Sequence, residues 1–289
     1  MRLGILASGD LGENMLMKII LNYQIDFIAT DQKSTNIILF SNKNGIRCFV
    51  GNPRNNKLID KLKVFNCDVL ISINYLFLID QNIINIPKIL AFNIHGSLLP
   101  KYRGRTPHVW AIINNEKLTG ITAHVIDKGC DTGPIIGQVK IDIDQRDTGG
   151  DLLTKFNVEY PKLIFDTLEK IRNNTLSYTE QVHQSSSFFG KRTPSDGLIN
   201  WHWYKERIFN WVRAQSSPYP GAFSFYENEK IIIDEIIYEN IGFHQDDENG
   251  LIIRVENNMP FIKTPNGIVK ITKIRNLKSI QFLKLKKFI

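Results

Sequence analysis

The first half of the chain alternates short apolar runs with segments of helical periodicity, and this alternation restricts the fold more than any other feature. Leu3 to Ala7, Asp68 to Ile73 and Leu90 to His95 are each as long as one buried strand. Lys57 to Val64 and the stretch that begins at Pro107 have helical patterns instead. Strands separated by helices form a mostly parallel sheet with helices on both faces. We therefore expect the α/β class and a Rossmann-like domain.

The pattern changes near Ser185. Before it, Thr148 with Asp151 three residues later predicts the start of a long helix. After it, an aromatic-rich helix is expected over Trp201 to Gln215, and five short β-like runs follow as far as Ile274. Such runs predict a small, OB-like β domain. We place a larger domain at residues 1–195 and a helix-plus-β domain at 196–289.

Composition argues against a secreted or membrane protein. The 289 residues are 43% hydrophobic, yet no apolar run approaches the roughly 18 residues that a membrane helix needs. Gly9 and Asp10 interrupt the N-terminal apolar stretch too early for a secretory signal. The three cysteines, Cys48, Cys67 and Cys130, are scattered, which fits reduced thiols. We expect a cytoplasmic location and no membrane partner.

The net charge of +7 lies at the C-terminal end of the chain. Lys and Arg occur repeatedly between Lys270 and Ile289 without any acidic residue, and the rest of the chain is balanced. A basic end could contact phosphates or an anionic surface. It could also be a solvated face, which is the more common role of such runs. We favour the second interpretation and do not expect a nucleic-acid partner.

Two segments carry residues suited to catalysis. Asn93 and His95 are two positions apart at the end of an expected strand, so their side chains point the same way, beyond the carboxyl ends where open α/β sheets bind ligands. Asp131 follows a later strand. An amide can stabilise an oxyanion, an imidazole can move a proton, and a nearby carboxylate would raise the histidine pKa. The set suits direct acyl transfer to an amine, although each residue alone could be a satisfied polar group or, for Asp131, a turn residue.

These segments resemble the folate-dependent formyltransferases, which use N10-formyltetrahydrofolate as formyl donor and need no metal. The matching residues are Asn93-x-His95-Gly96-Ser97-x-Leu99-Pro100, Arg103-Gly104 and Asp131-Thr132-Gly133. Pro218 to Phe223 also resembles the start of the C-terminal domain in the longer members. The resemblance covers nearly the whole chain.

The resemblance implies roles for individual residues. Asn93 would stabilise the transition state, His95 would be the acid/base, and Asp131 would raise the pKa of His95. Contacts to the folate donor are implied for two loops and one arginine: Phe77, Leu78, Ile79, Arg105, Asp127, Lys128, Gly129 and Cys130.

The resemblance is strongest to the branch that acts on nucleotide-linked amino sugars. Phe189 to Asp196 is similar to the loop after the catalytic domain of UDP-4-amino-4-deoxyarabinose formyltransferase, which implies that Arg192 contacts the sugar nucleotide; a plain surface arginine is the alternative. Thr30 to Asn36 lacks the basic insertion usual in methionyl-tRNA formyltransferases, which remain the alternative function. We expect a dTDP-, UDP- or GDP-linked 3-amino or 4-amino deoxy sugar for surface polysaccharide as the partner, and leave a homodimer open.

Two further ideas are weaker. His108, His124 and Cys130 match no zinc spacing, so we expect no metal. Gly9 to Gly12 is expected to be a tight turn, and without a GxGxxG motif it is weak evidence for a phosphate cradle.

Overall fold

The computed structural model describes residues 1–53, 59–62, 64–276 and 280–289. These form two compact units. The first contains residues 1–107, 119–142 and 153–189, and the second contains 108–118, 143–152 and 190–289. The two units interleave along the chain and so share no single boundary. The predicted domains 1–195 and 196–289 therefore stay a prediction.

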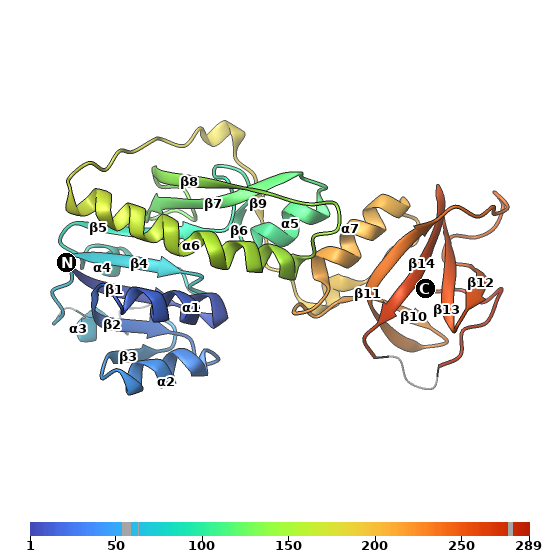
Figure 1. Ribbon diagram of the computed structural model, residues 1–289, viewed down its shortest axis with the longest axis horizontal. Coiled ribbons are helices and arrows are strands. Elements are labelled where there is room, and N and C mark those ends of the chain that lie inside the picture. Colours follow the sequence, from blue (N-terminus) through green and yellow to red (C-terminus); the bar gives the residue numbers. More distant parts are fainter. Residues whose placement is uncertain (54–58, 63, 277–279) are drawn as a thin grey trace. The chain divides into compact units, whose positions relative to one another are not determined.

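The first unit is built on a seven-stranded sheet (Figure 1). Its strands are β1 (Arg2–Ala7), β2 (Gln24–Thr30), β3 (Arg47–Val50), β4 (Val69–Ile73), β5 (Leu90–His95), β7 (Leu118–Val125) and β8 (Ile135–Asp142). Their order is β3-β2-β1-β4-β5-β7-β8. The first five are parallel, and β7 pairs with β5 in the antiparallel direction. The predicted Rossmann-like, mostly parallel sheet is confirmed.

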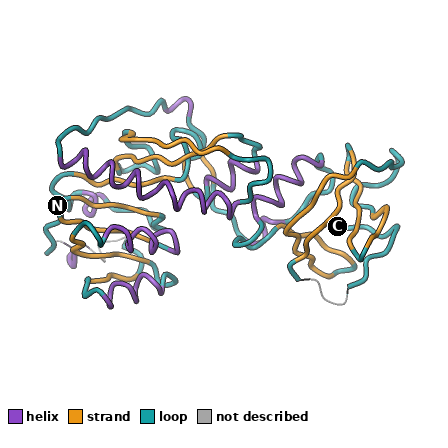
Figure 2. Tube along the Cα trace, viewed as in Figure 1, coloured by secondary structure: helices purple, strands orange, loops and turns teal. Residues whose placement is uncertain are grey.

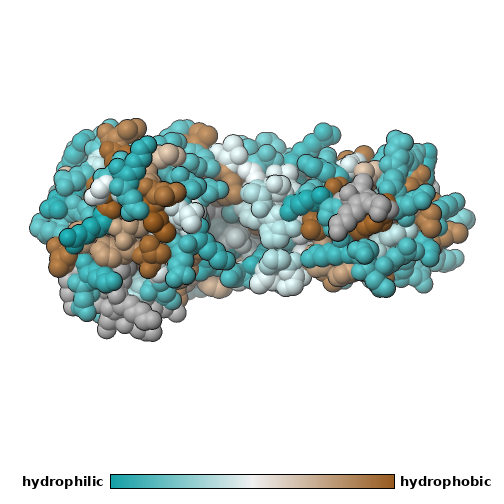
Figure 3. Space-filling model, turned by 90° about the horizontal axis from the view of Figure 1, so that it is seen from below, coloured by the Kyte–Doolittle hydropathy of each residue, from teal (hydrophilic) through white to brown (hydrophobic). Residues whose placement is uncertain are grey.

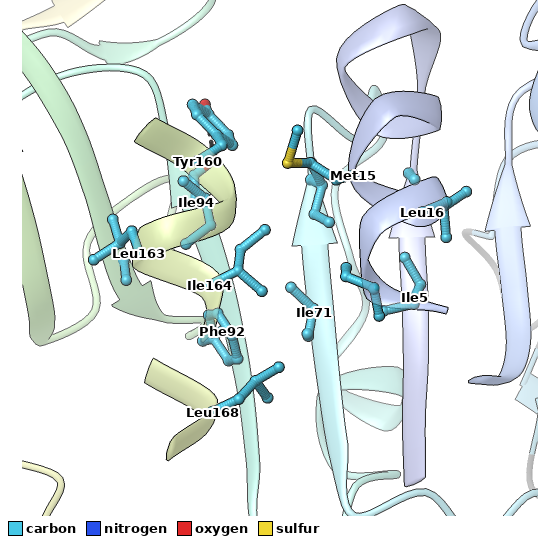
Figure 4. Close-up of a cluster of buried hydrophobic side chains, with 14 of the residues drawn as sticks. Ile5, Met15, Leu16, Ile71, Phe92, Ile94, Tyr160, Leu163, Ile164 and Leu168 are labelled. Carbon is cyan, nitrogen blue, oxygen red and sulfur yellow. Dashed lines mark hydrogen bonds between the residues drawn. The ribbon is translucent and has the colours of Figure 1, made fainter. Parts of the chain in front are cut away.

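Helices cover both faces of this sheet, as the alternation of side chains along β1 requires. These helices are α1 (Gly9–Ile19), α2 (Thr35–Lys43), α3 (Ile59–Leu62), α4 (Gln81–Ile84) and α6 (Gly149–Arg172). All but the first residue of α5 (Pro107–Ile113) belongs to the second unit. Ile5 belongs to a cluster with Met15 of α1 and Ile164 of α6, drawn in Figure 4. Leu6 belongs to a different cluster, with Ile83 of α4. Successive residues of one strand therefore join two separate cores.

Two local expectations have different outcomes. The expected turn at Gly9 to Gly12 is wrong, because α1 begins at Gly9 directly after β1. Gly12 packs close to that strand, since a Cβ there would lie 3.0 Å from the Cβ of Ala7. The expected start of α6 is confirmed: the Thr148 backbone N–H donates to Asp151 (2.9 Å) and the Asp151 N–H donates to the Thr148 hydroxyl (3.1 Å). Of the helix expected over 57–64, residues 57, 58 and 63 lie outside the described residues.

The second unit contains a five-stranded antiparallel sheet, seen in Figure 2 among long loops. Its strands are β10 (Ala222–Tyr226), β11 (Glu229–Glu239), β12 (Ile252–Glu256), β13 (Met259–Thr264) and β14 (Gly267–Ile274). They run in the order β10-β11-β14-β13-β12. The predicted small β-rich domain is confirmed. Its helix α7 (Lys205–Gln215) starts later than expected, because residues 200–203 form a turn closed by Trp203 N–H and Asn200 O (3.0 Å).

The basic C-terminal end is part of this second fold. Ile289 exchanges two backbone hydrogen bonds with Phe225 of β10, and Lys286 O accepts one from Ile252 of β12. The last residues thus bind both edge strands of the sheet. Lys286 pairs with Glu227 and Lys287 with Glu248, so these charges have acidic partners within the unit.

The surface carries scattered apolar residues. On the face drawn in Figure 3 hydrophilic side chains are widespread, and apolar side chains gather in patches between them. Leu21 and Leu39 are among the exposed apolar residues, which is common in globular proteins. Within the described ranges, none of the helices combines the length and the apolar character that a membrane crossing requires.

The α6 core contact yields a stability prediction. Ile164→Ala should lower the free energy of unfolding by about 2–5 kcal/mol, because Ile164 is fully buried and its removal leaves a cavity. Val158→Ala on the same helix is the control, since Val158 is 53% exposed. Urea unfolding measures both variants, and equal losses would contradict the assigned packing of α6.

Candidate functional site

Asn93 and His124 meet across two paired strands. In the antiparallel pairing of β5 with β7, Asn93 lies directly opposite His124, so both side chains point to the same face. His124 Nδ1–H donates to the Val125 carbonyl (2.8 Å), which leaves Nε2 as an acceptor. Asn93 Nδ2–H donates to that Nε2 at 3.1 Å. The amide is therefore held in one orientation.

His95 stands at the end of β5 and is buried, with 6% of its surface exposed. Its Nε2–H donates to the carbonyl of Tyr102 at 2.8 Å. Because this bond takes the ring proton of the neutral imidazole, Nδ1 is free to accept a proton. Nδ1 lies 3.5 Å from Oδ1 of Asp131.

Asp131 lies in the turn between β7 and β8, with a left-handed φ of 56°. Its Oδ2 accepts the Gly104 backbone N–H at 2.9 Å. Its Oδ1 is 3.5 Å from His95 Nδ1 and also 3.5 Å from His124 Nε2. The structure thus brings Asn93, His95 and Asp131 together, and adds His124.

Burial and charge act against each other at this cluster. Burial lowers the pKa of His95 and outweighs Asp131, which acts to raise it. The expected effect of Asp131, to raise the pKa of His95, is present, but burial of the ring, which the sequence does not reveal, outweighs it. For Asp131, burial acts to raise the pKa, but His95, His124 and the Gly104 N–H hold it well below its usual range. The carboxylate stays ionised beside a neutral imidazole at neutral pH.

The lowered pKa of His95 also affects stability. In the unfolded chain His95 takes up a proton below its ordinary pKa of about 6.5. The folded protein binds that proton only at a lower pH, so protons favour the unfolded state in this interval. The contribution of His95 is thus a loss of stability as the pH falls below its ordinary value.

The loop with Phe77, Leu78 and Ile79 connects β4 to α4 and is tied to the cluster through Arg105. The guanidinium of Arg105 donates to the carbonyl of Leu76, while the neighbouring Gly104 binds Asp131. Leu76 and Leu78 are 39% and 53% exposed. This loop therefore offers an apolar surface close to the groups that hold the carboxylate.

The residues from Asp127 to Cys130 form a tight turn that leads into Asp131. Asp127 Oδ1 accepts the Gly129 N–H (3.0 Å) and the Thr132 hydroxyl (2.7 Å). Lys128 is exposed. Burial and Asp131 raise the pKa of the Cys130 thiol to about 11, so it stays protonated at neutral pH.

Arg192 belongs to the second unit and is held by the protein's own groups. Its guanidinium carbon lies 5.0 Å from the ring centre of Trp110 and 4.3 Å from that of Trp211. Its Nη2 donates to Asp196 O (2.7 Å) and Gln215 Oε1 (2.6 Å). These contacts account for a structural role of Arg192, and its contact with a sugar nucleotide stays a prediction.

In the sequence, His124 stands out only as a weak candidate metal ligand, together with His108 and Cys130. His108 bonds instead to the Tyr219 hydroxyl in the second unit, and His124 faces Asp131. Across the part of the chain that the structure describes, no three His, Cys, Asp or Glu side chains are grouped to hold a metal ion. His124 joins the site because the antiparallel register pairs it with Asn93. No feature of the sequence predicts that register.

Comparisons with known proteins identify relatives that match most of the chain. A family model described as "Formyl transferase" matches residues 27–168, and one described as "Formyl transferase, C-terminal domain" matches 191–285. The chain is 37% identical over 224 residues to methionyl-tRNA formyltransferase of Thermodesulfovibrio yellowstonii, covering 77% of this chain and 70% of that protein.

A second relative matches over a shorter region. The bifunctional polymyxin resistance protein ArnA of Wigglesworthia glossinidia brevipalpis is 41% identical over 182 residues, which is 63% of this chain but only 28% of that longer protein. Among solved structures, the N-formyltransferase from Helicobacter canadensis, in complex with folinic acid and dTDP-3-aminofucose, has a TM-score of 0.71 at 22% identity and covers 94% of this chain and 99% of that chain. At that identity the likeness establishes the fold.

The electrostatics of the cluster predict a titration. The pKa of His95 should lie below 6.5 in the native protein, and Asp131→Asn should lower it further, because burial then acts without the opposing carboxylate. NMR titration of the histidine ring signals measures both, with the exposed Asp166→Asn as control. A His95 pKa that rises in Asp131→Asn would contradict the assignment.

Proposed function

The chain belongs to the formyl transferase family, and we propose that it transfers a formyl group from N10-formyltetrahydrofolate to the amino group of a nucleotide-linked amino sugar. One observation carries the proposal: an amide, a neutral imidazole and an ionised carboxylate converge at the end of β5. These are the groups that direct acyl transfer to an amine needs.

Asn93 would stabilise the oxyanion. When the amine attacks the formyl carbon, its carbonyl oxygen gains negative charge and needs a hydrogen-bond donor already in place. Asn93 Nδ2 carries two hydrogens, and His124 binds one of them. The second can be donated to the oxyanion, while the bond to His124 keeps the amide from rotating away.

His95 would move the proton. Its Nδ1 accepts a proton from the attacking amine, while Nε2–H keeps its bond to Tyr102 O. The resulting imidazolium lies 3.5 Å from the Asp131 carboxylate, which stabilises its positive charge. The same Nδ1–H then protonates the nitrogen of the donor as its bond to the formyl carbon breaks, which returns His95 to the neutral form.

The two loops beside the cluster are suited to hold the donor. The exposed Leu76 and Leu78 offer an apolar surface to a flat ring, and Arg105 fixes that loop next to Gly104. The second loop is the turn of residues 127–130, which directly precedes Asp131. The Helicobacter canadensis neighbour, which binds folinic acid, supports a folate donor here. We assign the donor contacts to Phe77, Leu78, Ile79, Arg105 and residues 127–130.

An amino sugar is favoured over a tRNA as acceptor. The dTDP-3-aminofucose bound by the Helicobacter neighbour supports a sugar nucleotide. The tRNA alternative is supported by the 37% identity to a methionyl-tRNA formyltransferase. However, the loop after β2 is short and closed by Asp31, which accepts the Lys33 N–H (2.8 Å) and the Ser34 hydroxyl. Such a loop provides no basic arm for RNA. The product would serve surface polysaccharide synthesis in the cytoplasm.

A substrate panel tests the function. The protein with N10-formyltetrahydrofolate should add one formyl mass to a dTDP-, UDP- or GDP-linked 3-amino or 4-amino deoxy sugar. Asn93→Ala should lower turnover by roughly 10²-fold, since one oxyanion donor is lost. The exposed Asn36→Ala is the matched control and should keep full turnover.

Charged initiator methionyl-tRNA is the second arm of the same panel. Formylation of that tRNA, steeply weakened by salt, with no transfer to any amino sugar would establish the alternative function. Turnover that is unchanged in Asn93→Ala would refute the role of the amide with either acceptor.

A further inference from the structure

Residues 181–189 run alongside the loop of residues 102–105, and we call them the strap. Arg103 N–H donates to Ser187 O (2.8 Å) and Arg105 N–H donates to Phe189 O (3.0 Å), so β6 (Arg103–Gly104) and β9 (Phe188–Phe189) pair in parallel. The Tyr102 ring stacks on Phe189 with centroids 4.9 Å apart. The strap lies between the ranges 27–168 and 191–285 that the two family models match.

The loop that the strap holds supplies two bonds to the cluster. The carbonyl of Tyr102 accepts the His95 Nε2–H, and the N–H of Gly104 binds Asp131 Oδ2. Tyr102 has a left-handed φ of 59°, which is an unfavourable conformation for a non-glycine residue. The direction of its carbonyl therefore depends on contacts that hold the backbone in place.

Gln181 connects this loop to the turn of Asp131. Its side chain is buried, and its Oε1 accepts hydrogen bonds from Arg103 Nη2 (2.6 Å) and Nε (3.2 Å). Its Nε2 donates to the carbonyls of Asp131 (3.0 Å) and Gly133 (2.7 Å). One planar amide thus binds both segments that orient the cluster.

We infer that Gln181 is a positioning residue for formyl transfer: it sets the separation between His95 Nδ1 and the Asp131 carboxylate by joining the loop that orients the ring to the turn that carries the carboxylate. The consequence for turnover rests on the proposed function, whereas the geometric effect on His95 does not. Glutamine suits this place because one side chain offers an acceptor and two donors. Its removal would leave a buried arginine and two carbonyls without these bonds.

Two substitutions separate the halves of the amide. Gln181→Leu removes both sets of bonds, while Gln181→Glu keeps the acceptor for Arg103 and loses the donors to Asp131 and Gly133. Ser41→Ala is the control, because it also removes a buried hydrogen bond of the first unit (Ser41 hydroxyl to Ile37 O, 2.7 Å) and that bond touches none of the cluster residues.

The first measurement is the NMR signature of His95 in protein with ¹⁵N-labelled histidine. The native protein should show the Nε2–H tautomer. Gln181→Leu should mix the two tautomers, because the loop that carries the Tyr102 carbonyl loses the anchor of its Arg103 side chain. Gln181→Glu keeps that anchor and should retain the native tautomer. The second measurement is turnover: both variants should lower kcat by roughly 10- to 100-fold, with KM for the amino sugar changed by less than about threefold.

Each result decides the inference. A native His95 signature together with native kcat in Gln181→Leu and Gln181→Glu overturns it, as does an equal response of Ser41→Ala. If Gln181→Leu does not fold, Gln181→Glu decides through its kcat. If the native protein transfers no formyl group, the proposed function fails, and the His95 signature still tests whether Gln181 positions the ring.

Discussion

The carboxylate of Asp131, largely buried beside two imidazole rings, is the group on which the rest of the site depends. A buried carboxylate is costly unless it is hydrogen-bonded or paired. Here the Gly104 N–H binds one oxygen, and the other faces a ring nitrogen of His95 and one of His124, each of which pairs with the carboxylate when it takes up a proton. The pKa of Asp131 is accordingly held low although burial acts to raise it. A permanent negative charge therefore lies where an imidazolium would form.

The sheet explains why these groups meet. The side chains of Asn93 and His95 point to the same face of β5. Strand β7 pairs with β5 in the antiparallel direction, which places His124 opposite Asn93. The turn after β7 then carries Asp131 back to the end of β5. Left-handed backbone at Tyr102 and Asp131 adds local strain. The surrounding hydrogen bonds, including those of Gln181, hold that strained backbone.

Much of this arrangement could be predicted from the sequence, and the rest has identifiable physical reasons for escaping it. Alternating apolar runs reveal the parallel sheet, and the spacing of Asn93 and His95 reveals that they share a face. The start of α1 escapes prediction because the glycines indicate a turn, whereas Gly12 allows close packing against β1. His124 reaches the site through the antiparallel register of β5 and β7, and Gln181 reaches it because residues 181–189 run back alongside residues 102–105. Local sequence patterns encode neither arrangement. Burial of His95, which lowers its pKa and outweighs the opposing effect of Asp131, is a property of the folded chain alone.

The most direct test of the central claim is a crystal structure of the protein with 5-formyltetrahydrofolate, as a stable donor analogue, and a nucleotide-linked amino sugar. We predict that the formyl oxygen lies within about 3.2 Å of Asn93 Nδ2 and that the sugar nitrogen lies within hydrogen-bond reach of His95 Nδ1. A formyl group and an amine that both bind away from these two atoms would contradict the account.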